Sequence, residues 1–188
     1  MHTTFTSTST STSTSTSTST STSTSTSTSI RAALLALLAS LVAVAGLASP
    51  SHAVTKLTDA QAASQLSASG ISRVSSGGCT NRNVSTCTSY DQINQETVSG
   101  IKTFRSVSGC AVTITGGTET GHASGTYSHW NGYKVDISPT TCVSSYITSH
   151  YAYYGVRGDG ATMYRAASGN IYARESNHWD ITYYTCGC

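Results

Sequence analysis

Six cysteines, all between Cys79 and Cys188, constrain the fold of this chain of 188 residues more than any other feature of its sequence. They follow an uncharged apolar segment, residues 32–48, which comes directly after Arg31 and is followed by Ser51-His52-Ala53. A basic residue, an apolar run and small residues in that order are typical of a secretory signal peptide, which we expect to span residues 30–53. The run is shorter than the about 20 residues of a membrane span, which disfavours a transmembrane anchor. An even number of cysteines in an exported chain predicts disulfides.

The spacing of the cysteines favours disulfides over the alternative of a zinc thiolate site, because the chain has no Cys-x-x-Cys pair. We expect a local pair, Cys79 with Cys87, and a second pair, Cys110 with Cys142. The pairing within Cys186-Gly187-Cys188 stays open, because a bridge across one residue is strained unless the backbone turns sharply.

Composition divides the chain into three parts. Residues 1–29 are dominated by alternating serine and threonine, a tract without apolar surface that we expect to be disordered. Residues 54–188, about 135 residues, are enough for one domain. We expect residues 54–87 to form its amino-terminal helix and a loop closed by a disulfide. The basic residues of this part are scattered, which argues against binding to nucleic acid or to a membrane after signal cleavage. We expect a secreted, extracellular monomer.

Hydrophobic periodicity predicts an α+β domain. Apolar residues at helical spacing indicate helices over residues 58–70 and 93–108 and a short one after Pro139, and β-branched alternation indicates four strands. The expected strands are residues 110–115, 132–137, 171–174 and 179–184. The sequence therefore predicts a small antiparallel sheet of about four strands, with helices packed on one side and disulfides that stabilise it.

One segment combines residue types that bind metals. His129 stands at the mouth of a predicted strand, and Asp136 lies inside it. Gly132 between them lets the backbone turn, so that the imidazole and the carboxylate can converge.

A second segment supplies another carboxylate and another imidazole. Glu175 and His178 flank a tight connection between the last two predicted strands, so pairing of those strands would bring both to one end of the sheet. Two imidazoles and one carboxylate form an open zinc site, and a nearby second carboxylate can act as general base. The alternative is that His129 and His178 are ordinary surface or core histidines.

The order His129, Gly132, Asp136, Glu175-x-x-His178 resembles the zinc D-Ala-D-Ala peptidase superfamily. That superfamily includes VanX-type dipeptidases, phage endolysin peptidases and the metal-binding domain of hedgehog proteins. The resemblance covers about residues 88–184 and implies that His129, Asp136 and His178 bind Zn²⁺ and that Glu175 is catalytic.

The chain also departs from that pattern. Tyr127 stands where the family commonly has serine, and the upstream loop, residues 115–122, has no arginine to hold a substrate carboxylate. His122 in this loop and Arg157 are candidates for binding the substrate, with an ordinary loop histidine and a solvated turn residue as the alternatives. An endopeptidase therefore fits at least as well as an enzyme specific for terminal D-Ala.

Two residues next to His178 are candidates for supporting the site. Asp180 can orient a ligating imidazole through its second nitrogen, and Trp179 adjoins it in sequence. Together these features predict a zinc peptidase that acts on cell-wall stem peptides or another extracellular peptide. The alternatives are a non-enzymatic secreted domain with a structural zinc ion and a disulfide-rich protein without metal.

Overall fold

The computed structural model describes residues 53–184. Their central element is a seven-stranded mixed sheet. The predictions for the serine–threonine tract, the signal peptide and Cys186-Gly187-Cys188 lie outside the described residues. Within residues 53–184, no helix has both the length and the apolar character that crossing a membrane requires.

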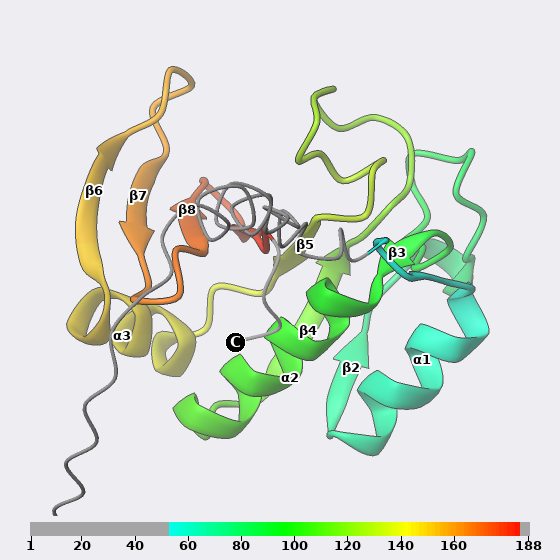
Figure 1. Cartoon of the computed structure of the whole chain (residues 1–188), viewed down its shortest axis with the longest axis horizontal. Helices are drawn as coiled ribbons and strands as arrows, with labels where there is room; N and C mark the ends of the chain where they lie inside the picture. The colour runs from blue at the N-terminus through cyan, green and yellow to red at the C-terminus, as the bar shows by residue number, and fades with distance from the viewer. Residues whose placement is uncertain (1–52, 185–188) are drawn as a thin grey trace, which may run out of the picture. The chain divides into compact units, whose positions relative to one another are not determined.

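The strands of the main sheet follow the order β2-β4-β5-β9-β8-β7-β6 (Figure 1). β2 pairs with β4 in parallel, and every other neighbouring pair is antiparallel. A separate two-stranded sheet joins β1 to β3. The strands are β1 (Lys56–Leu57), β2 (Ile71–Arg73), β3 (Ile93–Asn94), β4 (Val112–Gly116), β5 (Lys134–Ile137), β6 (Ala152–Val156), β7 (Thr162–Arg165), β8 (Ile171–Arg174) and β9 (Trp179–Thr182).

The three predicted helices are confirmed as α1 (Asp59–Ala68), α2 (Gln95–Ser108) and α3 (Thr141–His150). Thr58 caps α1 by accepting a hydrogen bond from the backbone N–H of Gln61, whose own side chain bonds back to the cap. Gly109 ends α2 in the left-handed conformation, which glycine adopts without steric cost. A short 3-10 turn, Ser76–Gly78, lies between α1 and α2.

The predicted sheet of about four antiparallel strands is wrong in size and in pairing. All four expected strands are present, but β2, β6 and β7 join them, and the β2–β4 contact is parallel. β2 has only three residues, too few to show a periodicity. β6 lies at the sheet edge and is largely exposed on both faces, so its sequence carries no alternation of buried and exposed residues.

The hydrophobic core lies between the helices and one face of the sheet. Val135 and Ile137 of β5 and Ile181 of β9 are fully buried there, together with apolar residues of α1, α2 and α3. Because side chains alternate along a strand, the intervening positions of β5 and β9 face the other side. That second face carries Lys134, Asp136 and Asp180, and the candidate site is built on it.

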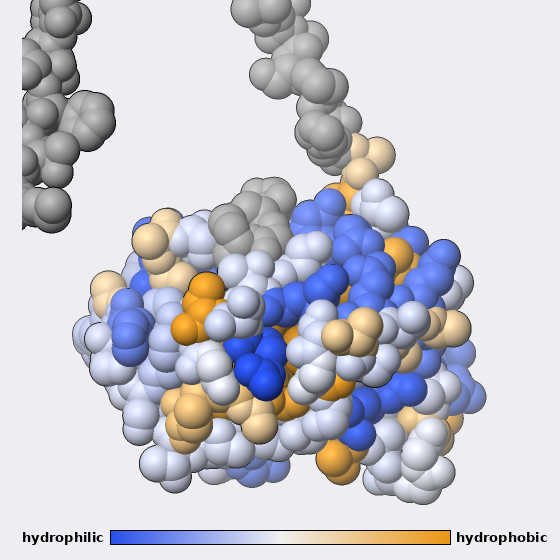
Figure 2. Space-filling view, turned by 90° about the horizontal axis from the view of Figure 1, so that it is seen from below, coloured by the Kyte–Doolittle hydropathy of each residue, from blue (hydrophilic) through white to orange (hydrophobic). Residues whose placement is uncertain are grey.

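Two disulfides hold the described part of the chain, and both predicted pairings are confirmed. Cys79–Cys87 closes a local loop with a sequence separation of 8, and Cys110–Cys142 joins the start of β4 to α3 across a separation of 32. On the face in Figure 2, hydrophobic residues lie in separate patches among hydrophilic ones, a normal surface for a protein with one buried core.

Candidate metal centre

The site begins with two aspartates that lie opposite each other on neighbouring strands. In the antiparallel pair of β5 and β9, Asp136 is directly opposite Asp180, and both side chains are largely buried. Two like charges directly opposite each other destabilise a sheet. The surrounding residues therefore have to supply positive charge or a cation.

His129 reaches the two aspartates from the loop before β5. The backbone N–H of Gly132 donates to the carbonyl of His129 over 2.7 Å, and Gly132 itself has a φ of 77°. A Cβ at Gly132 would lie 2.5 Å from the carbonyl oxygen of Gln92, so the turn needs glycine. The His129 ring is buried, and its Nδ1 donates to the carbonyl of Gly117 over 2.6 Å.

His178 comes from the connection between β8 and β9. The backbone N–H of Glu175 donates to the carbonyl of His178 over 3.1 Å, which closes the turn and brings both side chains to one end of the hairpin, as predicted. His178 Nδ1 lies 2.8 Å from Asn177 Oδ1. Because that oxygen only accepts, Nδ1 carries the proton, which leaves the lone pair of the neutral ring on Nε2.

The three predicted metal ligands meet at one carboxylate oxygen. His129 Nε2 lies 3.3 Å from Asp136 Oδ1, and His178 Nε2 lies 3.5 Å from the same oxygen. With zinc–ligand bonds of about 2.0–2.2 Å, two donors on a tetrahedral ion stand about 3.3–3.6 Å apart. Each of the two distances from Asp136 Oδ1 therefore matches the separation of a pair of zinc ligands.

Two buried oxygens at this point accept no hydrogen bond from the described residues. They are Asp136 Oδ1 and Asp180 Oδ1, which lie 3.3 and 3.7 Å from His129 Nε2. A buried carboxylate oxygen without a partner is costly unless a cation or a charged donor compensates it. A second proton on His129 or a metal ion among His129, His178 and Asp136 would supply that compensation.

The charges of the site act strongly on His129. Burial lowers its pKa, but the negative charges of Asp136 and Asp180 outweigh this effect and raise the pKa of His129 to about 10. Without a metal, the ring therefore holds a second proton on Nε2. A bound metal would replace that proton, because a ligating imidazole coordinates through a deprotonated nitrogen.

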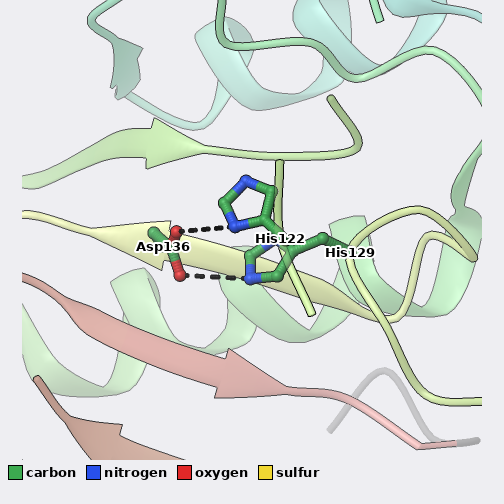
Figure 3. A group of neighbouring side chains, drawn as sticks. All are labelled: His122, His129 and Asp136. Atoms are coloured by element: carbon green, nitrogen blue, oxygen red, sulfur yellow. Dashed lines mark ion pairs between the residues drawn. The ribbon is translucent and has the colours of Figure 1, made fainter. Parts of the chain in front are cut away.

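His122 faces the other oxygen of Asp136. Its Nδ1 lies 3.9 Å from Asp136 Oδ2, and its ring stacks on His129 with the centroids 3.8 Å apart (Figure 3). The donor atoms of His122, His129 and Asp136 all lie within 4.8 Å of one another. Because the two stacked rings are nearly parallel, with 16° between their planes, they do not both direct a lone pair at one ion. His122 therefore borders the candidate metal site rather than completing it.

Glu119 fixes His122 in this position. Its buried carboxylate accepts hydrogen bonds from the backbone N–H groups of Ser89 and Gly117 and contacts His122 Nε2 over 3.0 Å. Burial raises the pKa of Glu119, but the bonds from His122, Ser89 and Gly117 lower it overall, so the carboxylate stays ionised. Nothing in the sequence pattern singled out Glu119, because two of its three contacts are to backbone N–H groups, one of them 30 residues away at Ser89.

Glu175 and Arg157 form the opposite wall. Glu175 Oε2 lies 3.4 Å from His178 Nε2, and Glu175 Oε1 accepts a hydrogen bond from Arg157. Arg157 also donates to Asp159 and, over 2.7 Å, to Asp180. The guanidinium that was predicted to bind substrate is thus held by three carboxylates of the chain itself.

The residues next to His178 have different positions from those expected. Asp180 lies near His129 Nε2, whereas the second nitrogen, Nδ1, has the carbonyl of Gly117 as its partner. Burial opposes ionisation of Asp180, but His129 and Lys134 lower its pKa well below the usual range. Trp179 points to the other face of the sheet and donates to Ser144 Oγ in α3 over 3.1 Å. It acts on the site only by holding β9 in place.

These groups line one open cleft of about 440 Å³. The cleft brings together every predicted site residue except Trp179, and the residues that line it are Gly121, His122, Ala123, His129, Lys134, Asp136, Arg157, Asp159, Glu175, His178 and Asp180. Comparison with protein-family models, curated proteins and solved structures gave no match.

Proposed function

We propose that this chain is a secreted zinc-dependent peptidase, with His129, Asp136 and His178 as the metal ligands and Glu175 as the general base. The observation that carries the proposal is the meeting of two imidazole Nε2 atoms at Asp136 Oδ1, at 3.3 and 3.5 Å. Partners on the Nδ1 atoms of both rings, Gly117 and Asn177, leave each Nε2 free to bind a metal.

Hydrolysis requires a polarised carbonyl, an activated water and a group that carries a proton. A zinc ion held by His129, Asp136 and His178 would supply Lewis-acid polarisation and would lower the pKa of a coordinated water to about 7. Glu175 Oε1 is paired with Arg157, so Oε2 is the oxygen that accepts the proton of the water. The oxygen of the water adds to the carbonyl carbon, the C–N bond breaks, and Glu175 delivers the proton to the leaving amine, which yields one carboxylate and one amine.

The substrate class follows from the predicted export of the chain and from the resemblance to cell-wall peptidases. Peptidoglycan stem peptides are extracellular and are the leading candidate. The cleft is open and polar, with charged groups on both walls, which suits a peptide backbone better than an apolar small molecule.

Metal analysis and the Glu175→Gln variant together test the proposal. We expect about one zinc ion per chain in both proteins, and chelator-sensitive hydrolysis of purified cell walls only by the wild type. Removal of a general base typically lowers kcat by about 10²- to 10⁴-fold. A wild-type protein that binds no zinc, or a Glu175→Gln protein with unchanged hydrolysis, would refute the assignment.

The alternative is a zinc-binding domain without catalytic activity. The pairing of Glu175 with Arg157 is the observation in its favour, because it engages one oxygen of the base. In that case wild type and Glu175→Gln would bind zinc equally, and neither would hydrolyse a peptide.

A further inference from the structure

Two further hollows adjoin the cleft. Beyond His122 it adjoins a hollow of about 230 Å³, which shares Gly121 and His122 with the cleft and extends to Trp130. Beyond Glu175 it adjoins a hollow of about 260 Å³, which shares Asp159 and Glu175 with the cleft. The cleft that holds the candidate metal centre therefore has one further hollow beside His122 and another beside Glu175, and the three together are here called the groove.

The groove offers little to hold the terminal carboxylate of a peptide. Lys134 is paired with Asp180 over 2.7 Å, and Arg157 is bound to Asp159, Glu175 and Asp180. Among the described residues, those that line the hollow beyond His122 include no lysine or arginine. Binding of a carboxylate normally uses charge-assisted hydrogen bonds from such a side chain.

One cation in the groove has no carboxylate partner. Arg174 lines the hollow beyond Glu175, where its Nη1 donates to the backbone carbonyls of Glu175 and His178 and its guanidinium lies 5.8 Å from the centre of the Trp179 ring. Through these contacts, Arg174 stabilises the turn between β8 and β9. A peptide carboxylate that reached this end would also face Glu175 and Asp159, which carry the same charge.

We infer that this protein is an endopeptidase, which cleaves a bond inside an extended peptide and binds residues on both sides of that bond. The inference rests on the proposed peptidase function and adds the substrate class. A carboxypeptidase needs a closed end and a receptor for the terminal carboxylate, whereas this cleft adjoins a further hollow at His122 and another at Glu175, and its cations are engaged by the chain.

The first test is digestion of purified cell walls by the zinc-loaded full-length secreted protein, with and without chelator. We expect mass analysis to find fragments that carry at least two residues on each side of the cleaved bond. Release of single carboxyl-terminal amino acids alone would overturn the inference and leave the peptidase proposal intact. If no chelator-sensitive product forms, and synthetic peptides are not cleaved either, both proposals are wrong.

The second test uses a synthetic peptide that spans the cleaved bond, as the free acid and as the carboxyl-terminal amide. For an endopeptidase, kcat/KM changes by less than about fivefold, because the end of the peptide lies outside the site. A carboxypeptidase loses charge-assisted bonds, and its kcat/KM falls by about 10- to 100-fold or more. The variant Arg174→Met, assayed on both peptides, shows whether Arg174 is a carboxylate receptor: an effect confined to the free acid would contradict the inference.

Substitutions that narrow either of the two outer hollows, here called the arms of the groove, provide a third test. Ser124 and Ser176 are exposed, one in each outer hollow, so tryptophan at either position narrows one arm without disturbing the core. We expect Ser124→Trp and Ser176→Trp each to lower kcat/KM by about tenfold or more on the spanning peptide. Ser145→Trp, on the exposed side of α3, is the matched control. If only one arm is sensitive, the substrate lies on one side of the site and the inference fails.

Discussion

Gly116 gives the sharpest test of the site, because it touches Asp136 but takes no part in chemistry. It ends β4 and lies directly opposite Asp136 in the ladder to β5. A Cβ at Gly116 would stand 2.4 Å from Asp136 Oδ2, 3.0 Å from its Cγ and 3.1 Å from its Cβ. Gly116→Ala therefore has to displace the carboxylate that the two imidazoles face.

The size of the effect follows from these distances. Ordinary contact begins at 3.4 Å, so the Asp136 oxygen has to move by about 1 Å. Ligand distances in metal sites are held to about 0.2 Å, a tolerance that this shift exceeds several times. We expect zinc affinity to fall by about 10- to 100-fold, the range seen when the orientation of a ligand is disturbed. The added methyl group also costs about 1–3 kcal/mol of the free energy of unfolding.

The assay is zinc titration of the metal-free protein with a competing chelator, beside denaturant unfolding. Two other glycine-to-alanine variants distinguish an effect on zinc affinity from an effect on the stability of the fold. Gly100→Ala places a Cβ 2.3 Å from the buried ring of Tyr183, so it should cost about 1–2 kcal/mol of stability after its gain in helix propensity, with zinc affinity unchanged. Gly158→Ala meets nothing within 4 Å and should change neither quantity.

One result would refute this reasoning. If Gly116→Ala binds zinc as tightly as the wild type while its unfolding curve shows the expected loss, the Asp136 carboxylate is not a metal ligand. The assignment of His129, Asp136 and His178 as a ligand set would then have to be abandoned.

Three further predictions address other parts of the molecule. His178→Ala should lower zinc affinity by at least about tenfold, whereas His150→Ala, on exposed α3, should leave it unchanged; equilibrium dialysis compares the two. Arg157→Met should lower kcat by about 10- to 100-fold with KM and zinc content nearly unchanged, because Arg157 positions Glu175; a rise in KM alone would instead indicate that it binds substrate. Replacement of Cys79–Cys87 by serines should cost about 2.6 kcal/mol of unfolding free energy, and replacement of Cys110–Cys142 about 3.7 kcal/mol, because the longer loop restricts the unfolded chain more; equal losses in urea unfolding would contradict the loop-entropy argument.

Local signals in the sequence were sufficient for most elements of the fold. Thr58 and Gly109 mark the ends of helices through short-range chemistry, a side-chain cap and a left-handed residue, so α1 and α2 were predictable. The number of strands in the sheet was not predictable in this way. β6 is an edge strand that buries little surface, and such a strand leaves no hydrophobic pattern.

The residues of the candidate site likewise divide into those that the sequence predicts and those that it does not. His129, Asp136, Glu175 and His178 were recognisable from residue type and spacing, and the two turns that bring them together depend on contacts within a few residues, such as that of Gly132 with His129. Their supporting partners were not recognisable. Gly117 contributes a backbone carbonyl, which leaves no mark on residue identity.

The sequence by itself determined which side chains can bind a metal, where the helices begin and end, and which cysteines pair locally, because each of these depends on neighbours along the chain. The tertiary structure alone decided the parallel β2–β4 contact, the pairing of Asp136 with Asp180, the hydrogen bond from Ser89 to Glu119 and the contacts of Arg157 with Glu175 and Asp180. These contacts join segments that are far apart in sequence, so only the packed sheet brings them together.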